Sequence, residues 1–282
     1  MAPLACVPTT AGSGSDVSHR TLIRDADSWR VRECISPTLR PDHAVVDPAF
    51  AMSCSAEVTA RSGAIALSNA VEAVLGIDFH QLHEPVEGLP FEGNNPLSDL
   101  LGMRSAELIR EHLVTTFESP TDIKSRTFMC LGASLAGAAV ANSGYGMVTA
   151  ITLATMNAHS TLSMGDIVLI VLPEVVRMFG RYSPERVLRI AATLVPEFAA
   201  QRPAVDQVED AAEVVASCCR QLRHTLGLPT CLADLGIVAD DIPRIASESV
   251  QNTLAATMTP GQVSVDAVID LLQRCLGNAA GG

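Results

Sequence analysis

The stretch SGAIALSNAVEAVLG, residues 62–76, decides what this chain folds into. Its periodicity is that of a helix, and Ser53 or Ser55, shortly before it, suits the capping position at the start of that helix. We expect the helix to run to about Leu75, with a bend at Gly63. The sequence therefore predicts one long helix through this stretch.

Helical periodicity continues along almost the whole chain after Pro48. Residues 1–50 instead alternate short β-like runs with turn residues, as a small β-rich unit does. Beyond them, helices are expected near residues 97–117, 121–141, 146–158, 166–180, 184–195, 206–226, 239–254 and 264–276. The predicted fold class is mainly α, with a β-rich N-terminal part over residues 1–50 and a large all-helical domain over residues 51–282.

The chain is both apolar and acidic. Of its 282 residues, 48% are hydrophobic, and 19 basic against 31 acidic residues give a formal net charge of -12. A negative charge of this size repels nucleic acid and anionic membranes, so neither is an expected partner. The high apolar fraction predicts a deep core or an apolar pocket.

One long segment, from Thr127 to Ala158, carries no charged residue. It exceeds the length that crosses a bilayer, but Asn142, Gly144 and Gly146 interrupt it in the middle. We therefore expect two buried helices here and no membrane span.

The eight cysteines are scattered and show no CxxC spacing. Such a pattern is typical of free thiols that are buried as small hydrophobic side chains in a reducing compartment. The first six residues do not form a signal peptide, because they lack a basic start and an apolar run of adequate length. A cytoplasmic location is the expectation.

Five segments, in order along the chain, carry a resemblance to a known family. They read VPTTAGSGSD (residues 7–16), HAVVDP (43–48), NPLSD (95–99), NSGYG (142–146) and GLPTCL (227–232). Together with residues 62–76, they resemble the iron-containing (group III) alcohol dehydrogenase and maleylacetate reductase family. The resemblance implies a dehydroquinate synthase-like helical C-terminal domain that follows a nucleotide-binding domain.

The resemblance also implies four metal-ligand positions, which in this chain are occupied by Ile65, Asn69, Thr149 and Met164. An aliphatic side chain has no lone pair to donate, and an amide is a far poorer partner for a transition metal than imidazole. We therefore expect a degenerate site with no metal ligands and no metal cofactor.

A nucleotide cofactor is not expected either. The resemblance implies a diphosphate-binding GGGS loop, but this chain starts only a few residues before its segment 7–16. Residues 12–14 form a short Gly-Ser-Gly turn, which alone is weak evidence for a nucleotide. The strands left over would have unpaired edges, and a homodimer that covers them is predicted.

The emptied cleft is expected to hold a small hydrophobic metabolite, because its lining combines apolar side chains with a few neutral hydrogen-bonding groups. His159, in a linker between apolar helices, is the candidate proton shuttle, and a surface-loop histidine is the alternative. Asn69 and Thr149 are the other catalytic candidates, with a satisfied core polar group as the alternative for each. The expected substrate contacts are Ile65, Met164, Tyr145 and Thr152.

Asp166 and Glu72 are two more acid/base candidates in this neighbourhood. A structural role is favoured for both. Asp166 is expected to cap the helix that follows it, and Glu72 is expected to hold an arginine.

The segment IDFHQLHEPVEGLPFEGN, residues 77–94, admits two interpretations. His80 and His83 would share one helical turn beside Glu84, which is compatible with a new metal site. Two prolines in the same segment break a helix, and we favour a solvated loop.

These observations lead to three hypotheses for function. The first is a metal-free, nucleotide-independent, non-redox enzyme of specialised biosynthesis: a cyclase, isomerase or dehydratase that acts on a small hydrophobic metabolite. The second is a fragment of an NAD(P)H-dependent oxidoreductase that resembles alcohol dehydrogenase or maleylacetate reductase. The third is a ligand-binding protein without catalytic activity.

Overall fold

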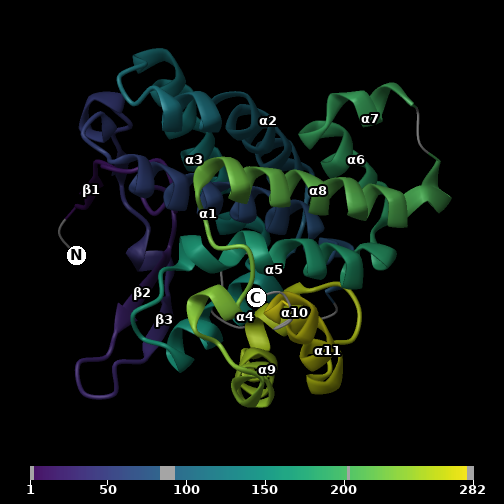
Figure 1. Ribbon diagram of the computed structural model, residues 1–282. Coiled ribbons are helices and arrows are strands. Elements are labelled where there is room, and N and C mark those ends of the chain that lie inside the picture. The colour runs from purple at the N-terminus through teal and green to yellow at the C-terminus, as the bar shows by residue number, and fades with distance from the viewer. Residues whose placement is uncertain (1–2, 83–92, 202–203, 278–282) are drawn as a thin grey trace.

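The computed structural model describes residues 3–82, 93–201 and 204–277. Helices make up most of it, as predicted, and they enclose a large shared core (Figure 1). Their bounds are α1 Ala56–Leu75, α2 Pro96–Glu118, α3 Ile123–Ser143, α4 Met147–Ala158, α5 Met164–Phe179, α6 Pro184–Leu194, α7 Pro196–Ala200, α8 Val208–Leu226, α9 Ile242–Gln251, α10 Thr253–Met258 and α11 Val265–Leu276. Each expected helix is present within a few residues of its predicted bounds, and α7 and α10 are short additions.

The strands of the described residues all lie before residue 45 and form two separate pairs. β1 (Ala5–Cys6) pairs in parallel with β4 (His43–Ala44), and β2 (Arg20–Arg24) pairs antiparallel with β3 (Val31–Ile35). All four lie together on one side of the helices (Figure 1). A mainly helical fold with a small β-rich N-terminal part is therefore confirmed.

Helix α1 lies at the centre of the helical domain and contacts α2, α3 and α5. Ser55 caps it as predicted, because its hydroxyl accepts the backbone amide of Val58 at 3.2 Å. The helix is continuous across Gly63, where a Cβ atom would lie only 2.2 Å from Leu113 Cδ1 of α2. Gly63 therefore permits close packing of α2 against α1.

The charge-free segment forms α3 and α4, and the chain turns between them at Gly144, whose φ is 89°. Both helices bury most of their residues in the protein core. The prediction of two buried helices is confirmed. Within the described residues, none of the helices combines the length and apolarity that spanning a bilayer requires.

The loop that follows β1 is held tightly against the helices. A Cβ atom on Gly14 would lie 2.4 Å from Gly137 Cα of α3, so the two backbones are in direct contact. Two residues on, the Asp16 carboxylate accepts a hydrogen bond from Ser134 of α3 at 2.5 Å. These contacts fix the position of residues 9–16 over the helical domain.

The surface around β1 and β4 is apolar, with large side chains at least one third exposed. They are Leu4, Val7, Leu39, Val45, Val46 and Phe50. Parallel strands normally occur inside larger sheets that are covered on both faces, whereas β1 and β4 pair only with each other among the described residues. A homodimer that covers this surface stays a prediction.

Candidate functional site

Asn69 and Ile65 lie on one face of α1, beneath the loop that contains Ser13. Asn69 is buried, and its side-chain amide donates a hydrogen bond to the Ser13 carbonyl at 3.3 Å. Ile65 is half-buried and packs against the main core. The amide of Asn69 thus ties the loop to the helix, which matches the alternative of a satisfied core polar group.

Thr149 is hydrogen-bonded to Glu72, and the Glu72 carboxylate takes the role of the N-cap side chain at the start of α4. One carboxylate oxygen of Glu72 accepts the backbone amides of Gly146 and Thr149, each at 3.0 Å, and the other accepts the Thr149 hydroxyl at 2.7 Å. Gly146 has no side chain to cap the helix, so a residue of α1 supplies the acceptor. Burial raises the pKa of the Glu72 carboxyl, against the opposing effect of these bonds and of nearby Arg20.

Tyr145 and Thr152 are core side chains in this structure. Tyr145 is 7% exposed, and the Arg20 guanidinium lies 3.8 Å from the centre of its ring. Arg20 also forms an ion pair with Glu33. Glu72 was expected to hold an arginine, but Glu72 is not the main partner of Arg20. Thr152 is fully buried, and its hydroxyl has no hydrogen-bond partner among the described residues.

The side chains at the four inherited ligand positions do not fit a metal ion. Ile65 offers no donor atom, the thioether of Met164 is a soft ligand, and the amide and hydroxyl of Asn69 and Thr149 already serve other hydrogen bonds. In the part of the chain that the structure describes, no three His, Cys, Asp or Glu residues are placed to share an ion. The chemistry of the donor set therefore argues against the family's metal.

His159 pairs with Asp241, a residue that sequence reasoning did not find. The Nε2 atom of His159 lies 3.1 Å from a carboxylate oxygen of Asp241, and the imidazole is 32% exposed. Burial would raise the pKa of Asp241, but hydrogen bonds from Val238, His159 and Arg244 outweigh it and lower that pKa. Asp241 thus stays anionic beside the imidazole.

His159 and Thr149 were expected to act in one reaction centre, but they lie too far apart for that. Thr149 lies in the first turn of α4 and His159 directly follows its last turn. At a rise of ~1.5 Å per residue the two are about 15 Å apart along the helix axis. The expected grouping of His159 with Asn69 and Thr149 is therefore wrong in space.

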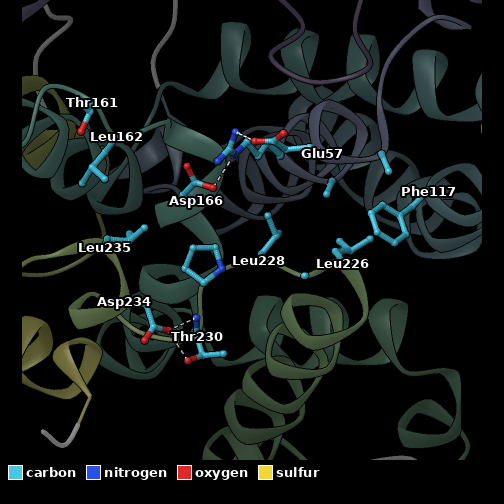
Figure 2. Close-up of a pocket in the computed structure, with 15 residues that line it drawn as sticks. Glu57, Phe117, Thr161, Leu162, Asp166, Leu226, Leu228, Thr230, Asp234 and Leu235 are labelled. Atoms are coloured by element: carbon cyan, nitrogen blue, oxygen red, sulfur yellow. Dashed lines mark hydrogen bonds and ion pairs between the residues drawn. The ribbon is translucent and has the colours of Figure 1, made fainter.

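A groove of about 760 Å³ lies near the C-terminal end of α4, with Thr161 and Leu162, shortly after His159, in its lining. Its walls are the start of α1, the turn from Thr161 to Asp166, and the segment from Leu226 to Leu235 (Figure 2). The apolar lining residues include Phe117, Leu162, Leu226, Leu228, Pro229 and Leu235. The volume and the mixed lining are typical of small-molecule sites.

Asp166 lines this groove but does not cap α5 as predicted. Ser163 is the cap, because its hydroxyl accepts the Gly165 amide at 3.3 Å. The Asp166 carboxylate, 7% exposed, instead accepts from Arg61 Nε at 2.7 Å. Met164, between them, is half-buried against the main core.

His83 and Glu84, which with His80 suggested a metal site in residues 77–94, lie outside the described residues. His80 is described and belongs to a short 3-10 helix, Phe79–Gln81. The ring of His80 contacts that of Phe79, with centroids 3.8 Å apart.

Comparison with known families agrees with this architecture. Residues 81–276 match the model of the C-terminal domain of the Fe-containing alcohol dehydrogenase family, and residues 1–48 match a model described as iron-containing alcohol dehydrogenase. The chain belongs to the iron-containing alcohol dehydrogenase family. Membership accounts for the helical fold around α1, and the replacement of the four ligand positions in this chain stays a prediction.

Curated relatives in the family are oxidoreductases by name. Mitochondrial hydroxyacid-oxoacid transhydrogenase of Mus musculus is 26% identical over 275 residues, which are 92% of this chain and 58% of that protein. Alcohol dehydrogenase 4 of Saccharomyces cerevisiae is 25% identical over 272 residues, 96% of this chain and 64% of that protein. The chain thus spans about 60% of the length of these relatives.

Solved structures of the family show the same fold. A 1,3-propanediol oxidoreductase matches with a TM-score of 0.83 at 24% identity, over 97% of this chain and 66% of that one. An alcohol dehydrogenase from Oenococcus oeni matches with a TM-score of 0.84 at 22% identity, over the same shares of both chains. At these identities the likeness concerns the fold.

Proposed function

We propose that this chain is a metal-independent, non-redox enzyme of the family, which moves protons on a small and largely hydrophobic molecule. Isomerisation, dehydration or cyclisation is redox-neutral and consumes no hydride, so the proposal includes independence of a nucleotide. The observation that carries it is the pairing of His159 with Asp241 beside the groove.

The pairing suits general acid/base catalysis. The Asp241 carboxylate orients one ring nitrogen of His159, which leaves the other nitrogen of the half-exposed ring to exchange a proton. Thr161 of the groove wall follows His159 by two residues, so their Cα atoms are at most about 7 Å apart. His159 itself is not among the lining residues, so the proposal requires that a bound molecule extend past Thr161 toward this imidazole.

Replacing His159 with glutamine is expected to lower turnover by about 100-fold or more, because glutamine cannot relay a proton. Asp241→Asn, a positioning variant, should lower it less and change its pH profile. The measurement is mass spectrometry of a cell extract incubated with the purified chain. It should reveal a product that is isomeric with its precursor or has lost water, and the rate of its formation is compared between variants.

His224→Gln is the matched control, because His224 is exposed on α8 outside the groove. An unchanged rate for His159→Gln would overturn the assignment of this residue. A product that differs from its precursor by two hydrogens would overturn the non-redox reaction.

Metal independence is tested separately. After incubation with Fe²⁺ or Zn²⁺ and removal of the excess, the chain is expected to retain far less than one ion per molecule by elemental analysis. The double variant Ile65→Asp with Asn69→His places two donors four residues apart on α1 and should retain more zinc. Stoichiometric metal in the unmodified chain would contradict the proposal.

A second candidate is an oxidoreductase, and the likeness to the transhydrogenase and alcohol dehydrogenases favours it. It predicts that the chain quenches NADH fluorescence at micromolar concentration, whereas the redox-neutral proposal predicts no change. The third candidate, a ligand-binding protein without turnover, predicts retention of a molecule from the extract without conversion.

A further inference from the structure

The groove carries more negative than positive charge. Its ionisable side chains are three carboxylates, Glu57, Asp166 and Asp234, and one guanidinium, Arg61. Arg61 is shared, since it forms ion pairs with both Glu57 and Asp166. In the described part of the chain no cationic side chain pairs with Asp234.

Asp234 is held in a fixed orientation by its own turn. One of its oxygens accepts the Thr230 amide at 2.8 Å, the Thr230 hydroxyl at 2.6 Å and the Cys231 amide at 3.2 Å. These bonds, led by the one from the Thr230 hydroxyl, lower the pKa of Asp234 and keep it ionised near neutral pH. The negative charge is therefore a permanent feature of the groove.

The apolar part of the lining lies between and beside these charges. Figure 2 shows the Glu57 and Asp166 carboxylates on one side of Leu228 and the Asp234 turn on the other. Leu226 and Phe117 continue the apolar surface at the far end from Asp234. An aromatic ring attracts cations through its face and also accepts hydrocarbon contact.

We propose that the groove binds an amphipathic organic cation, with a protonated amine near Asp234 and a hydrocarbon body along Leu228 toward Phe117. A molecule of this kind supplies the missing positive charge and covers the apolar lining at the same time. The inference deepens the proposed function, on which it rests for the role of the groove as the substrate site. It limits the substrate class to hydrophobic amines.

The test uses three probes with the same hydrocarbon chain and different head groups: octylammonium, octanoate and 1-octanol. Binding to the full chain is followed through the leucine methyl resonances in nuclear magnetic resonance titrations. Octylammonium is expected to bind with a Kd on the order of 1 mM and to shift the methyl signals of Leu226, Leu228 and Leu235. Octanoate and octanol are expected to bind more weakly.

Variants locate the two ends of the probe. Asp234→Asn keeps the acceptor oxygen of the turn and removes the charge, and it should weaken octylammonium binding about fivefold. Phe117→Ala removes apolar surface at the far end of the groove and should weaken it about threefold. Asp210→Asn removes a carboxylate on α8 outside the groove and should leave binding unchanged.

Equal affinity for the three probes would overturn the proposal, and so would methyl shifts confined to leucines outside the groove. If Asp234→Asn impairs folding, the methyl shifts of the unmodified chain still decide between the outcomes. Because no turnover is measured, the binding result is independent of the His159 experiment. If octylammonium binds as expected but His159→Gln keeps its activity, only the proposed catalysis is refuted.

Discussion

Replacing Gly137 with alanine is expected to destabilise the fold by about 3 kcal/mol. A Cβ atom at this position of α3 would lie 2.4 Å from the Gly14 carbonyl oxygen and 2.6 Å from its Cα. Both are backbone atoms, so no side chain can rotate away and the loop over residues 9–16 has to move. The intrinsic preference of a helix for alanine over glycine, about 1 kcal/mol, offsets only part of this cost.

The comparison that isolates the clash is Gly132→Ala in the same helix. There the nearest atom to the added Cβ atom would be Ile109 Cγ1, at 3.3 Å. This atom belongs to a side chain that can adjust, so stability should change little or rise. Urea unfolding followed by circular dichroism measures both variants. Equal midpoints for the two would show that the contact between Gly14 and Gly137 contributes nothing.

Replacing Glu72 with alanine is expected to cost a similar amount, about 3 kcal/mol. It leaves the amides of Gly146 and Thr149 and the Thr149 hydroxyl without their acceptor in the protein interior, at about 1 kcal/mol or more for each group. It also removes the partner of the first turn of α4. Glu72→Gln retains one acceptor oxygen and should cost less.

The same carboxyl predicts a pH dependence. Because burial raises its pKa in the folded protein, the folded state holds this proton at a pH where the unfolded chain has released it. The contribution of Glu72 to stability is therefore present below the pKa of the unfolded chain and declines as the pH rises through the folded pKa.

Glu72→Gln has no such proton, so the stability difference between it and the unmodified chain should shift in favour of the variant between about pH 4 and about pH 8. Urea unfolding at both pH values measures this shift. A difference that is constant with pH would refute the raised pKa, while leaving the hydrogen bonds of Glu72 intact.

The helices were predictable because helical periodicity and capping residues are patterns among residues that are close together in the sequence. Repeating apolar positions located α2 to α6, α8, α9 and α11, and Ser55 caps α1 as expected. The pairing of β3 with β2 was not predicted, since the residues of β3 alternate charge and apolar character too briefly to signal a hairpin.

The site was predictable only in part. The predicted loss of ligand donors rests on the resemblance, which places Ile65 and Asn69 at ligand positions, and on the chemistry of these side chains, which is the same in any fold. The partners of these residues do not: Asp241 is 82 residues from His159, and Asp234 is far from Arg61 in the chain although both line one groove. No local pattern encodes such proximity.

Periodicity along the chain was thus enough to predict a mainly helical protein, because it depends on neighbouring residues. The prediction of a degenerate metal site came instead from the resemblance to the family and from the side chains at the matched positions. Only the tertiary structure showed that the expected cleft is two places. Glu72 and Thr149 form a buried contact, and an open groove lies near His159. Buried polar groups need partners, and the identity of those partners depends on how distant helices meet.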